Sequence, residues 1–217
     1  MHTEHSAPLR PSWIVLTALV AAVLLSSAPA WAEGEERHDG FMIRLGLGFG
    51  VSGATFQEPG DGELELSATG GDAGHVNIAL GYAVIENLII HAEMFGGFLT
   101  NATVKLNGEE IGELGEDTQL NLYGFGIGVT YYVMPLNLYI AGSLGAADAN
   151  LQIDGETREL RDASGTAINL MVGKEWWVSD NWGLGVAAQY YRIDMEYAND
   201  GELDANAAGL LFSATFN

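Results

Sequence analysis

Apolar and polar positions alternate along eight segments of the chain, and the clearest of these segments runs from Phe41 to Gly50. Its odd positions hold Phe, Ile, Leu, Leu and Phe, whereas its even positions hold Met, Arg and three glycines. Successive side chains of a β-strand point to opposite faces, so this segment predicts a strand with one strongly apolar face. A soluble sheet would carry charged side chains on the other face, which here is mostly glycine. We therefore predict an all-β chain whose apolar face meets lipid and whose small or polar face lines a narrow lumen.

The same alternation predicts eight strands, near residues 40–51, 75–84, 88–99, 119–133, 138–147, 165–177, 182–193 and 205–217. A strand of about ten residues, tilted by roughly 40°, crosses the apolar band of about 25 Å in an outer membrane. Three connections are tight turns, and the other four are long, near residues 52–74, 100–118, 148–164 and 194–204. Short periplasmic turns and long external loops are typical of bacterial barrels. The predicted fold is an eight-stranded antiparallel up-and-down transmembrane β-barrel with both termini in the periplasm.

Residues 1–32 have the features of a secretory signal peptide. Arg10 supplies a positive charge, residues 13–25 are apolar, and Ala30-Trp31-Ala32 has the small-x-small pattern of a cleavage site. The apolar stretch is shorter than the roughly 20 residues of a membrane-spanning helix. We expect the leader to be cleaved, leaving an acidic periplasmic lead-in at residues 33–39 and a barrel at residues 40–217. An uncleaved N-terminal anchor is the alternative.

The charge of the chain is strongly negative, with 29 acidic and 8 basic residues and a formal net charge of −21. This balance excludes nucleic acid as a partner, because nucleic-acid binding needs a basic surface. The chain has no cysteine, which excludes a lipoprotein anchor and a disulfide framework. Neither a cofactor nor a resident metal is expected.

Each of the four long connections contains five acidic residues, and the densest group is Asp200, Glu202 and Asp204. Clustered carboxylates suit hard divalent cations, so these three residues form a candidate cation-binding loop. Their spacing does not match the twelve-residue calcium loop. The alternative interpretation is a solvated surface that keeps the loops apart by repulsion.

Few ionisable residues fall inside the predicted strands, and four of them share the lumenal face: Arg44, His91, Glu93 and Glu175. A buried unpaired charge is costly, so we predict that Arg44 pairs with Glu93, Glu175 or both, with His91 nearby. Such a network could act as a gate or a proton-sensitive plug. A structural role that fills the barrel is favoured, since an eight-stranded barrel is only wide enough for side chains or one small ligand.

Aromatic residues gather near the short turns. Rings with a polar edge favour a boundary that is apolar on one side and wet on the other. We therefore predict an aromatic girdle at the periplasmic interface, formed by Trp176, Trp177, Trp182, Tyr82, Tyr139 and Phe216.

The last predicted strand is aromatic-rich and has the sequence Leu210-Leu211-Phe212-Ser213-Ala214-Thr215-Phe216-Asn217. In this strand, in the alternation of apolar and polar positions, and in the alternation of short turns with long loops, the chain resembles the eight-stranded outer-membrane β-barrel proteins, which include the OmpA, OmpX and OmpW types. The resemblance covers residues 40–217. Barrels of this family usually end on an aromatic residue, a signal read by the assembly machinery, whereas here Phe216 is penultimate. The resemblance implies the outer membrane of a Gram-negative bacterium as the location. It implies membrane lipid, lipopolysaccharide and the barrel-assembly machinery as partners.

For function, we expect a structural or surface-interaction role through the acidic external loops, with divalent cations or an external molecule as candidate partners. Enzymatic activity is not expected, because no serine is linked by the sequence to His75, the histidine near the external rim. The resemblance to the OmpW type implies an alternative, a narrow pore for small apolar molecules. A soluble periplasmic ligand-binding barrel is a third possibility, and it would require the apolar faces to turn inward.

Overall fold

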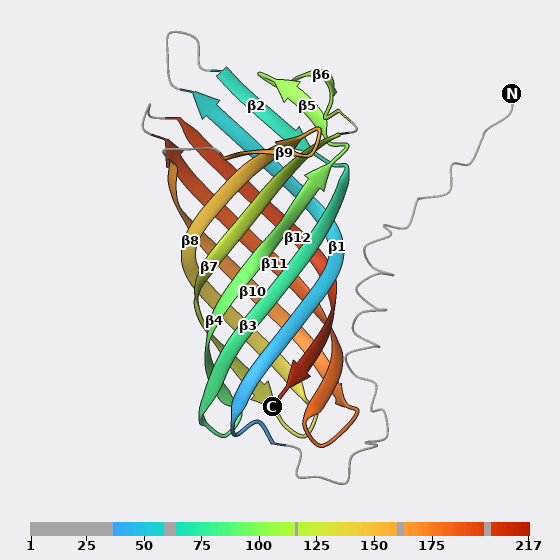
Figure 1. Cartoon of the computed structure of the whole chain (residues 1–217), viewed down its shortest axis with the longest axis vertical. Helices are drawn as coiled ribbons and strands as arrows, with labels where there is room; N and C mark the ends of the chain where they lie inside the picture. Colours follow the sequence, from blue (N-terminus) through green and yellow to red (C-terminus); the bar gives the residue numbers. More distant parts are fainter. Residues whose placement is uncertain (1–36, 59–63, 116, 160–162, 198–200) are drawn as a thin grey trace, which may run out of the picture.

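The computed structural model describes residues 37–58, 64–115, 117–159, 163–197 and 201–217. Eight long strands, each antiparallel to its neighbours, form a barrel. Figure 1 shows their arrangement. The last strand pairs with the first over their whole length and closes the sheet. The predicted fold class is therefore confirmed. The strands are β1 (Phe41–Glu58), β3 (Asp72–Ile85), β4 (Leu88–Thr100), β7 (Thr118–Val133), β8 (Leu138–Ile153), β10 (Ala163–Trp177), β11 (Trp182–Tyr197) and β12 (Glu202–Phe216).

Four short strands extend the sheet at the end of the barrel opposite the C-terminus (Figure 1). In the described residues, β2 pairs with β1, β5 with β2, β6 with β5, and β9 with β8. The long strands also continue into this region, and β1 runs to Glu58 rather than ending at residue 51. The four long connections are therefore built partly of strand. The short strands are β2 (Leu64–Thr69), β5 (Thr103–Leu106), β6 (Glu109–Glu113) and β9 (Glu156–Glu159).

The outer wall of the barrel carries large apolar side chains. Leu47, Ile127 and Phe212 are 69%, 74% and 69% exposed, respectively. A continuous exposed apolar surface of this kind is rare on a soluble monomer, and it matches the lipid-facing band of a membrane barrel. On β11 the band ends between Tyr190 and Arg192, where the outward positions become charged. Among the described residues, no helix is long and apolar enough to cross a membrane.

Inward-facing glycines let neighbouring strands approach closely. Gly126 on β7 lies opposite Gly145 on β8. A Cβ atom at Gly126 would overlap the carbonyl oxygen of Leu144, and one at Gly145 would overlap that of Phe125. The glycine-rich face of the sequence pattern therefore faces the lumen, where larger side chains would overlap the neighbouring strands of the narrow barrel.

Two large apolar clusters fill most of the described interior, and a smaller one is formed by Ala73, Leu99 and Ala102. The first lies toward the short turns and includes Met42, Ile89, Tyr132, Tyr139 and Met171. The second lies toward the opposite end, and its members come from strands on several sides of the barrel, which places it across the lumen. We call this second group the upper cluster; its large members are Phe95, Leu122, Tyr191, Ile193, Met195 and Leu203.

Candidate functional site

A buried ion pair lies in the middle of the lumen. Arg44 on β1 and Glu93 on β4 are both shielded from solvent, and Arg44 Nη2 lies 3.6 Å from Glu93 Oε1. Arg44 Nη1 donates to Thr130 Oγ1 at 3.3 Å, and the same oxygen lies 3.0 Å from Nε2 of His91. The guanidinium carbon also sits 4.7 Å from the ring centre of Tyr139. Three of the four ionisable residues predicted to share the lumen therefore belong to one connected group.

Neutral polar side chains complete the surroundings of Glu93. Its Oε1 accepts a hydrogen bond from Asn77 Nδ2 at 2.7 Å, and its Oε2 accepts from Ser143 and, at 3.2 Å, from Asn169 Nδ2. The chain of bonds continues from Gln189 Nε2 to Asn169 Oδ1 at 3.1 Å. These residues were not predicted as members of the network. They could have been found from their parity, since each sits on the lumenal face of its strand.

The network also extends toward the outer end of the lumen. His75 Nδ1 lies 3.1 Å from Gln189 Oε1, and the His75 ring lies 5.4 Å from that of Tyr191 in the upper cluster. Because every link joins two different strands, the network cross-links the barrel wall from the inside. Most of its buried polar groups are hydrogen-bonded to one another, although Arg44 Nε, His75 Nε2 and Asn77 Oδ1 have no hydrogen-bond partner among the described residues. The cross-strand links favour a rigid structural role.

Glu175 belongs to a separate group nearer the short turns. Its Oε1 accepts from Thr215 Oγ1 at 2.6 Å and its Oε2 accepts from the Tyr132 hydroxyl at 3.2 Å. The ring of Tyr132 stacks on His38 at 3.5 Å, and His38 Nε2 lies 2.8 Å from Asn137 Oδ1. The described part of the lead-in thus enters the barrel end and closes it there.

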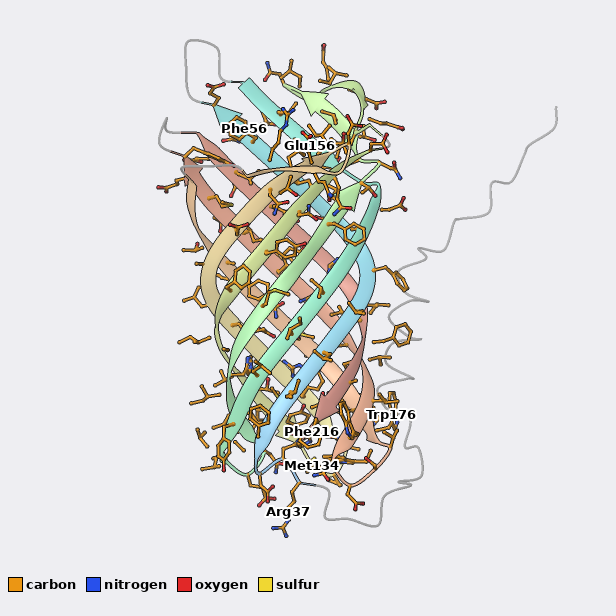
Figure 2. The ribbon with its side chains drawn as sticks, in the orientation of Figure 1. Arg37, Phe56, Met134, Glu156, Trp176 and Phe216 are labelled. Atoms are coloured by element: carbon orange, nitrogen blue, oxygen red, sulfur yellow. The ribbon has the colours of Figure 1, made fainter. Side chains whose placement is uncertain are left out.

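The predicted aromatic girdle divides into two sets. Tyr82 and Trp182 are 61% and 43% exposed on the outer wall, and Trp182 contacts Phe216 edge to face. Trp176 lies at the same end of the molecule as Phe216 (Figure 2) and is partly exposed. These four positions suit an interfacial girdle. Tyr139 and Trp177, in contrast, are 0% and 6% exposed and point inward, so their assignment to the girdle is wrong.

The physical reason is strand parity. Tyr139 lies between the outward-facing Leu138 and Ile140, and Trp177 directly follows Trp176. Neighbours along a strand face opposite ways, so proximity to a turn does not decide which side a ring occupies. Inside the barrel, Tyr139 packs against Arg44, and Trp177 lies 5.0 Å from the ring of His38.

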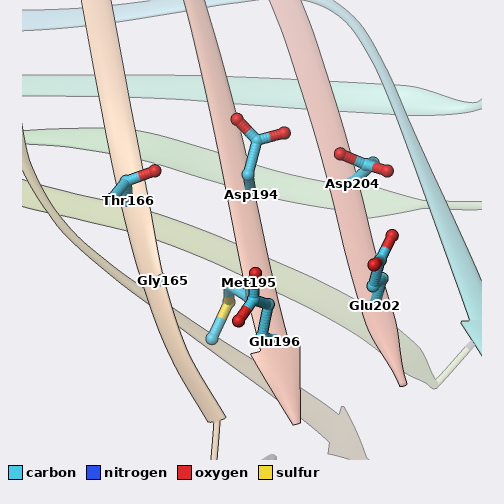
Figure 3. Close-up of a pocket in the computed structure, with 7 residues that line it drawn as sticks. All are labelled: Gly165, Thr166, Asp194, Met195, Glu196, Glu202 and Asp204. Atoms are coloured by element: carbon cyan, nitrogen blue, oxygen red, sulfur yellow. The ribbon is translucent and has the colours of Figure 1, made fainter. Parts of the chain in front are cut away.

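An acidic hollow lies above the apolar band, on the outer faces of β10, β11 and β12 (Figure 3). Arg192 Nη2 pairs there with Asp194 Oδ1 at 2.6 Å and with Asp204 Oδ1 at 3.0 Å. Hydrogen bonds from Arg192 lower the pKa of Asp194, whereas a hydrogen bond with Asp194 raises the pKa of Asp204. The hollow has a volume of about 460 Å³, and its lining residues are Gly165, Thr166, Asp194, Met195, Glu196, Glu202 and Asp204.

The candidate cation-binding loop gains no support from this geometry. Asp204 is paired with Arg192, and Asp200 lies outside the described residues. Within the described part of the chain, no group of three or more histidine, cysteine or acidic side chains is arranged to hold a metal ion. The cluster of acidic residues that suggested the site is partly neutralised by Arg192 on β11.

An apolar cavity opens at the outer mouth of the barrel, directly above the upper cluster. It has a volume of about 410 Å³. Its floor includes Ala54 and Leu203, which belong to the upper cluster, and Phe56 and Tyr197 pack against the same cluster. Figure 2 shows Phe56 at the end of the molecule opposite Phe216. The other lining residues come from β2, β5, β7, β8 and the segment after β6, and they are Leu66, Ala68, Val104, Leu114, Leu120 and Leu151.

This cavity was not predicted from the sequence. Its residues lie in segments that were treated as long connections, although apolar residues recur there at every second position, as in Ala54 and Phe56 or Leu66 and Ala68. In the structure β2 pairs beside β1, with Leu66 opposite Phe56 and Ala68 opposite Ala54. The alternation of apolar and polar residues continues beyond the apolar band, and this pattern could have indicated that strands extend into the long connections.

Comparison with solved structures finds the same fold in an outer-membrane barrel. Neisserial surface protein A has a TM-score of 0.54 at 14% identity, over 84% of this chain and 99% of that one. OprG from Pseudomonas aeruginosa gives a TM-score of 0.46 at 10% identity, over 83% and 97% of the two chains. Ail of Yersinia pestis gives 0.39 at 13% identity, over 81% and 99%. At 14% identity the similarity to Neisserial surface protein A concerns the fold alone.

Sequence comparison places the chain in a family. No curated protein matches it. The family model for the outer membrane protein beta-barrel domain, however, matches residues 18–216, which is nearly the whole chain. This match agrees with the closed barrel and its apolar outer wall. The chain therefore belongs to the outer membrane protein beta-barrel domain family.

Proposed function

We propose that this protein is a non-enzymatic outer-membrane protein that acts at the cell surface by binding an apolar molecule at its external mouth. The observation that carries the proposal is the cavity of about 410 Å³ above the upper cluster, whose lining is almost entirely aliphatic and aromatic. Concave apolar sites of about 300–1,000 Å³ are typical of small-molecule binding. Leu66, which lines the cavity, is 41% exposed. A ligand that covers this apolar surface removes it from water, which contributes favourably to the free energy of binding.

The filled lumen favours binding over conduction. Below the cavity, Phe95, Leu122 and Ile193 of the upper cluster are almost fully buried. The Arg44–Glu93 network and the layer around Tyr132 and Tyr139 follow beneath it. A solute entering from outside would have to displace several packed layers. The narrow pore is therefore the less favoured alternative.

The proposed orientation places the long strands' extensions and the cavity outside the cell. The three tight turns and the C-terminal strand end lie together at the opposite end of the barrel (Figure 1), as expected for a periplasmic side. A cleaved leader would deliver the chain to the periplasm for assembly. The acidic connections would then face the external medium beside the lipopolysaccharide.

Methyl NMR of the protein in lipid nanodiscs tests the binding proposal. On addition of N-phenyl-1-naphthylamine, we expect the signals of Leu66, Leu120 and Leu203 to shift, because they line the cavity. The lipid-facing Leu47 should stay unchanged. Leu66→Asp should weaken binding at least tenfold, since it places a carboxylate in the apolar lining. Shifts confined to Leu47, or no shifts, would contradict the proposal.

A matched control is available at the same end of the barrel. Ile111 on β6 is 59% exposed and is not part of the cavity lining. Ile111→Asp makes a comparable apolar-to-acidic change outside the cavity, so it should leave probe affinity unchanged. Equal loss of affinity in both variants would indicate a general charge effect rather than a site in the cavity.

Conductance in planar lipid bilayers separates the two candidate functions. We expect the purified barrel to give no stepwise ion currents, because packed side chains occupy the described lumen. Reproducible unitary currents from folded protein would favour the pore. A refolded channel-forming porin run in parallel shows that the bilayer preparation can detect channels.

A further inference from the structure

We infer that the cavity at the external mouth selects an amphiphile with one apolar chain and a cationic head group. The inference rests on the proposed function and adds the chemical class of the ligand. The apolar lining provides the binding energy for a chain, and the charges around the opening determine which head group can remain beside it.

The lining residues alternate with acidic residues along their strands. Glu65, Glu113, Glu196 and Glu202 each immediately precede a lining residue, and all four are exposed. Asp204 directly follows the lining residue Leu203. Because neighbours along a strand face opposite sides, Glu65, Glu196, Glu202 and Asp204 stand on the rim and outer surface while the adjacent apolar side chains face the cavity. Among the described residues, two basic residues adjoin the lining: Lys105 follows Val104, and Arg158 on β9 lies opposite Leu151.

The four long connections as a whole also carry a net negative charge. The four long connections contain five acidic residues each, and their basic residues are Lys105, Arg158 and Arg161. Like charges gathered at one end of a protein produce a potential that attracts ligands of opposite charge. An anionic head group at the cavity mouth would be repelled by the same field.

The other well-placed cations already have partners. Arg192 is on the outer face, where it pairs with Asp194 and Asp204. Arg44 lies below the upper cluster in its ion pair with Glu93. Neither guanidinium faces the cavity mouth, so neither offers a binding site for a carboxylate or phosphate head group there.

The size and shape of the cavity limit the apolar part of the ligand. A volume of about 410 Å³ lies near the lower end of the range for small-molecule pockets, about 300–1,000 Å³. The floor is closed by Ala54, Leu203 and the side chains packed beneath them. One alkyl chain fits a cavity of this volume, whereas a lipid with several acyl chains does not.

Three ligands with the same ten-carbon chain test the inference: decylamine, decanol and decanoate. Each is titrated at neutral pH and low salt into methyl-labelled protein in zwitterionic nanodiscs, with free ligand corrected against empty nanodiscs. We expect the dissociation constant of decylamine to be about tenfold lower than that of decanoate, with decanol between them. At about 1 M salt, where the screening length is about 3 Å, the three values should converge.

Charge-neutral variants show whether the rim is responsible. The triple variant Glu65→Gln, Glu113→Gln and Glu202→Gln should bind decanol as the parent does but lose most of the preference for decylamine. Glu86→Gln, in a turn at the opposite end, should keep that preference. Equal affinities for all three ligands in the parent protein would overturn the inference while leaving the proposed function intact. Absence of cavity shifts with every ligand, N-phenyl-1-naphthylamine included, would overturn both.

Discussion

Replacing Arg44 with methionine is expected to lower the free energy of unfolding by about 3–5 kcal/mol, because it leaves a buried carboxylate without its counter-charge. Glu93 is 4% exposed and its Oε1 lies 3.6 Å from Arg44 Nη2. Methionine fills much of the same volume, so the loss measures charge more than packing. Urea unfolding in lipid nanodiscs, followed by the mobility of unheated protein on gels, gives the midpoint for each variant.

A second substitution separates charge from packing. In the double variant Arg44→Met and Glu93→Gln, no charge remains unpaired. The single amide oxygen of the glutamine can accept from Asn169, and its NH2 group can donate to Asn77 Oδ1 once that amide turns over, since this oxygen has no other partner among the described residues. Most of the lost stability should therefore return. A double variant as unstable as Arg44→Met alone would show that the ion pair is not the source of the loss.

Arg192 provides a matched control on the surface. Its side chain is 52% exposed and pairs with Asp194 and Asp204 in solvent. Exposed ion pairs contribute about 0–1 kcal/mol. Arg192→Met should therefore change stability little, and a loss as large as that of Arg44→Met would contradict the distinction between lumenal and surface charges.

The sequence pattern was sufficient to predict the barrel because period-two alternation determines which residues face lipid. The same parity put Arg44 and Glu93 on the lumenal face. It could not show that Glu175 bonds to Thr215 and Tyr132, because the stagger between strands decides which lumenal residues meet. Strand stagger depends on the closure of the whole barrel, which no local pattern specifies.

The external cavity shows a different limit of sequence reasoning. Leu66 and Phe56 both fall in the predicted long connection 52–74, yet they lie opposite each other where β2 pairs with β1. Leu120 and Leu203 reach the same cavity from other sides of the barrel. Their apolar character was visible in the sequence, but their convergence requires the closed sheet.

Replacing Gly126 with alanine is expected to destabilise the barrel by about 3 kcal/mol, at the upper end of the range for overpacked interiors. The new Cβ would overlap the carbonyl oxygen of Leu144 and approach Gly145 Cα within 2.7 Å. The obstacle is backbone, which cannot move aside as a flexible side chain can. To relieve the overlap, β7 and β8 would have to separate at their hydrogen-bonded register. Urea midpoints in nanodiscs and the yield of heat-modifiable protein should both fall.

Gly142→Ala makes the same chemical change on the neighbouring strand and should be tolerated. Gly142 is flanked by the lumenal Ala141 and Ser143, and a Cβ there would meet the side chain of Leu170 at 3.5 Å, an ordinary contact distance. The two variants therefore differ in which side of the wall receives the methyl group. If both were equally destabilised, the loss would reflect the general effect of removing glycine from a strand. A loss confined to Gly126→Ala would show that the narrow interior itself requires glycine at that position.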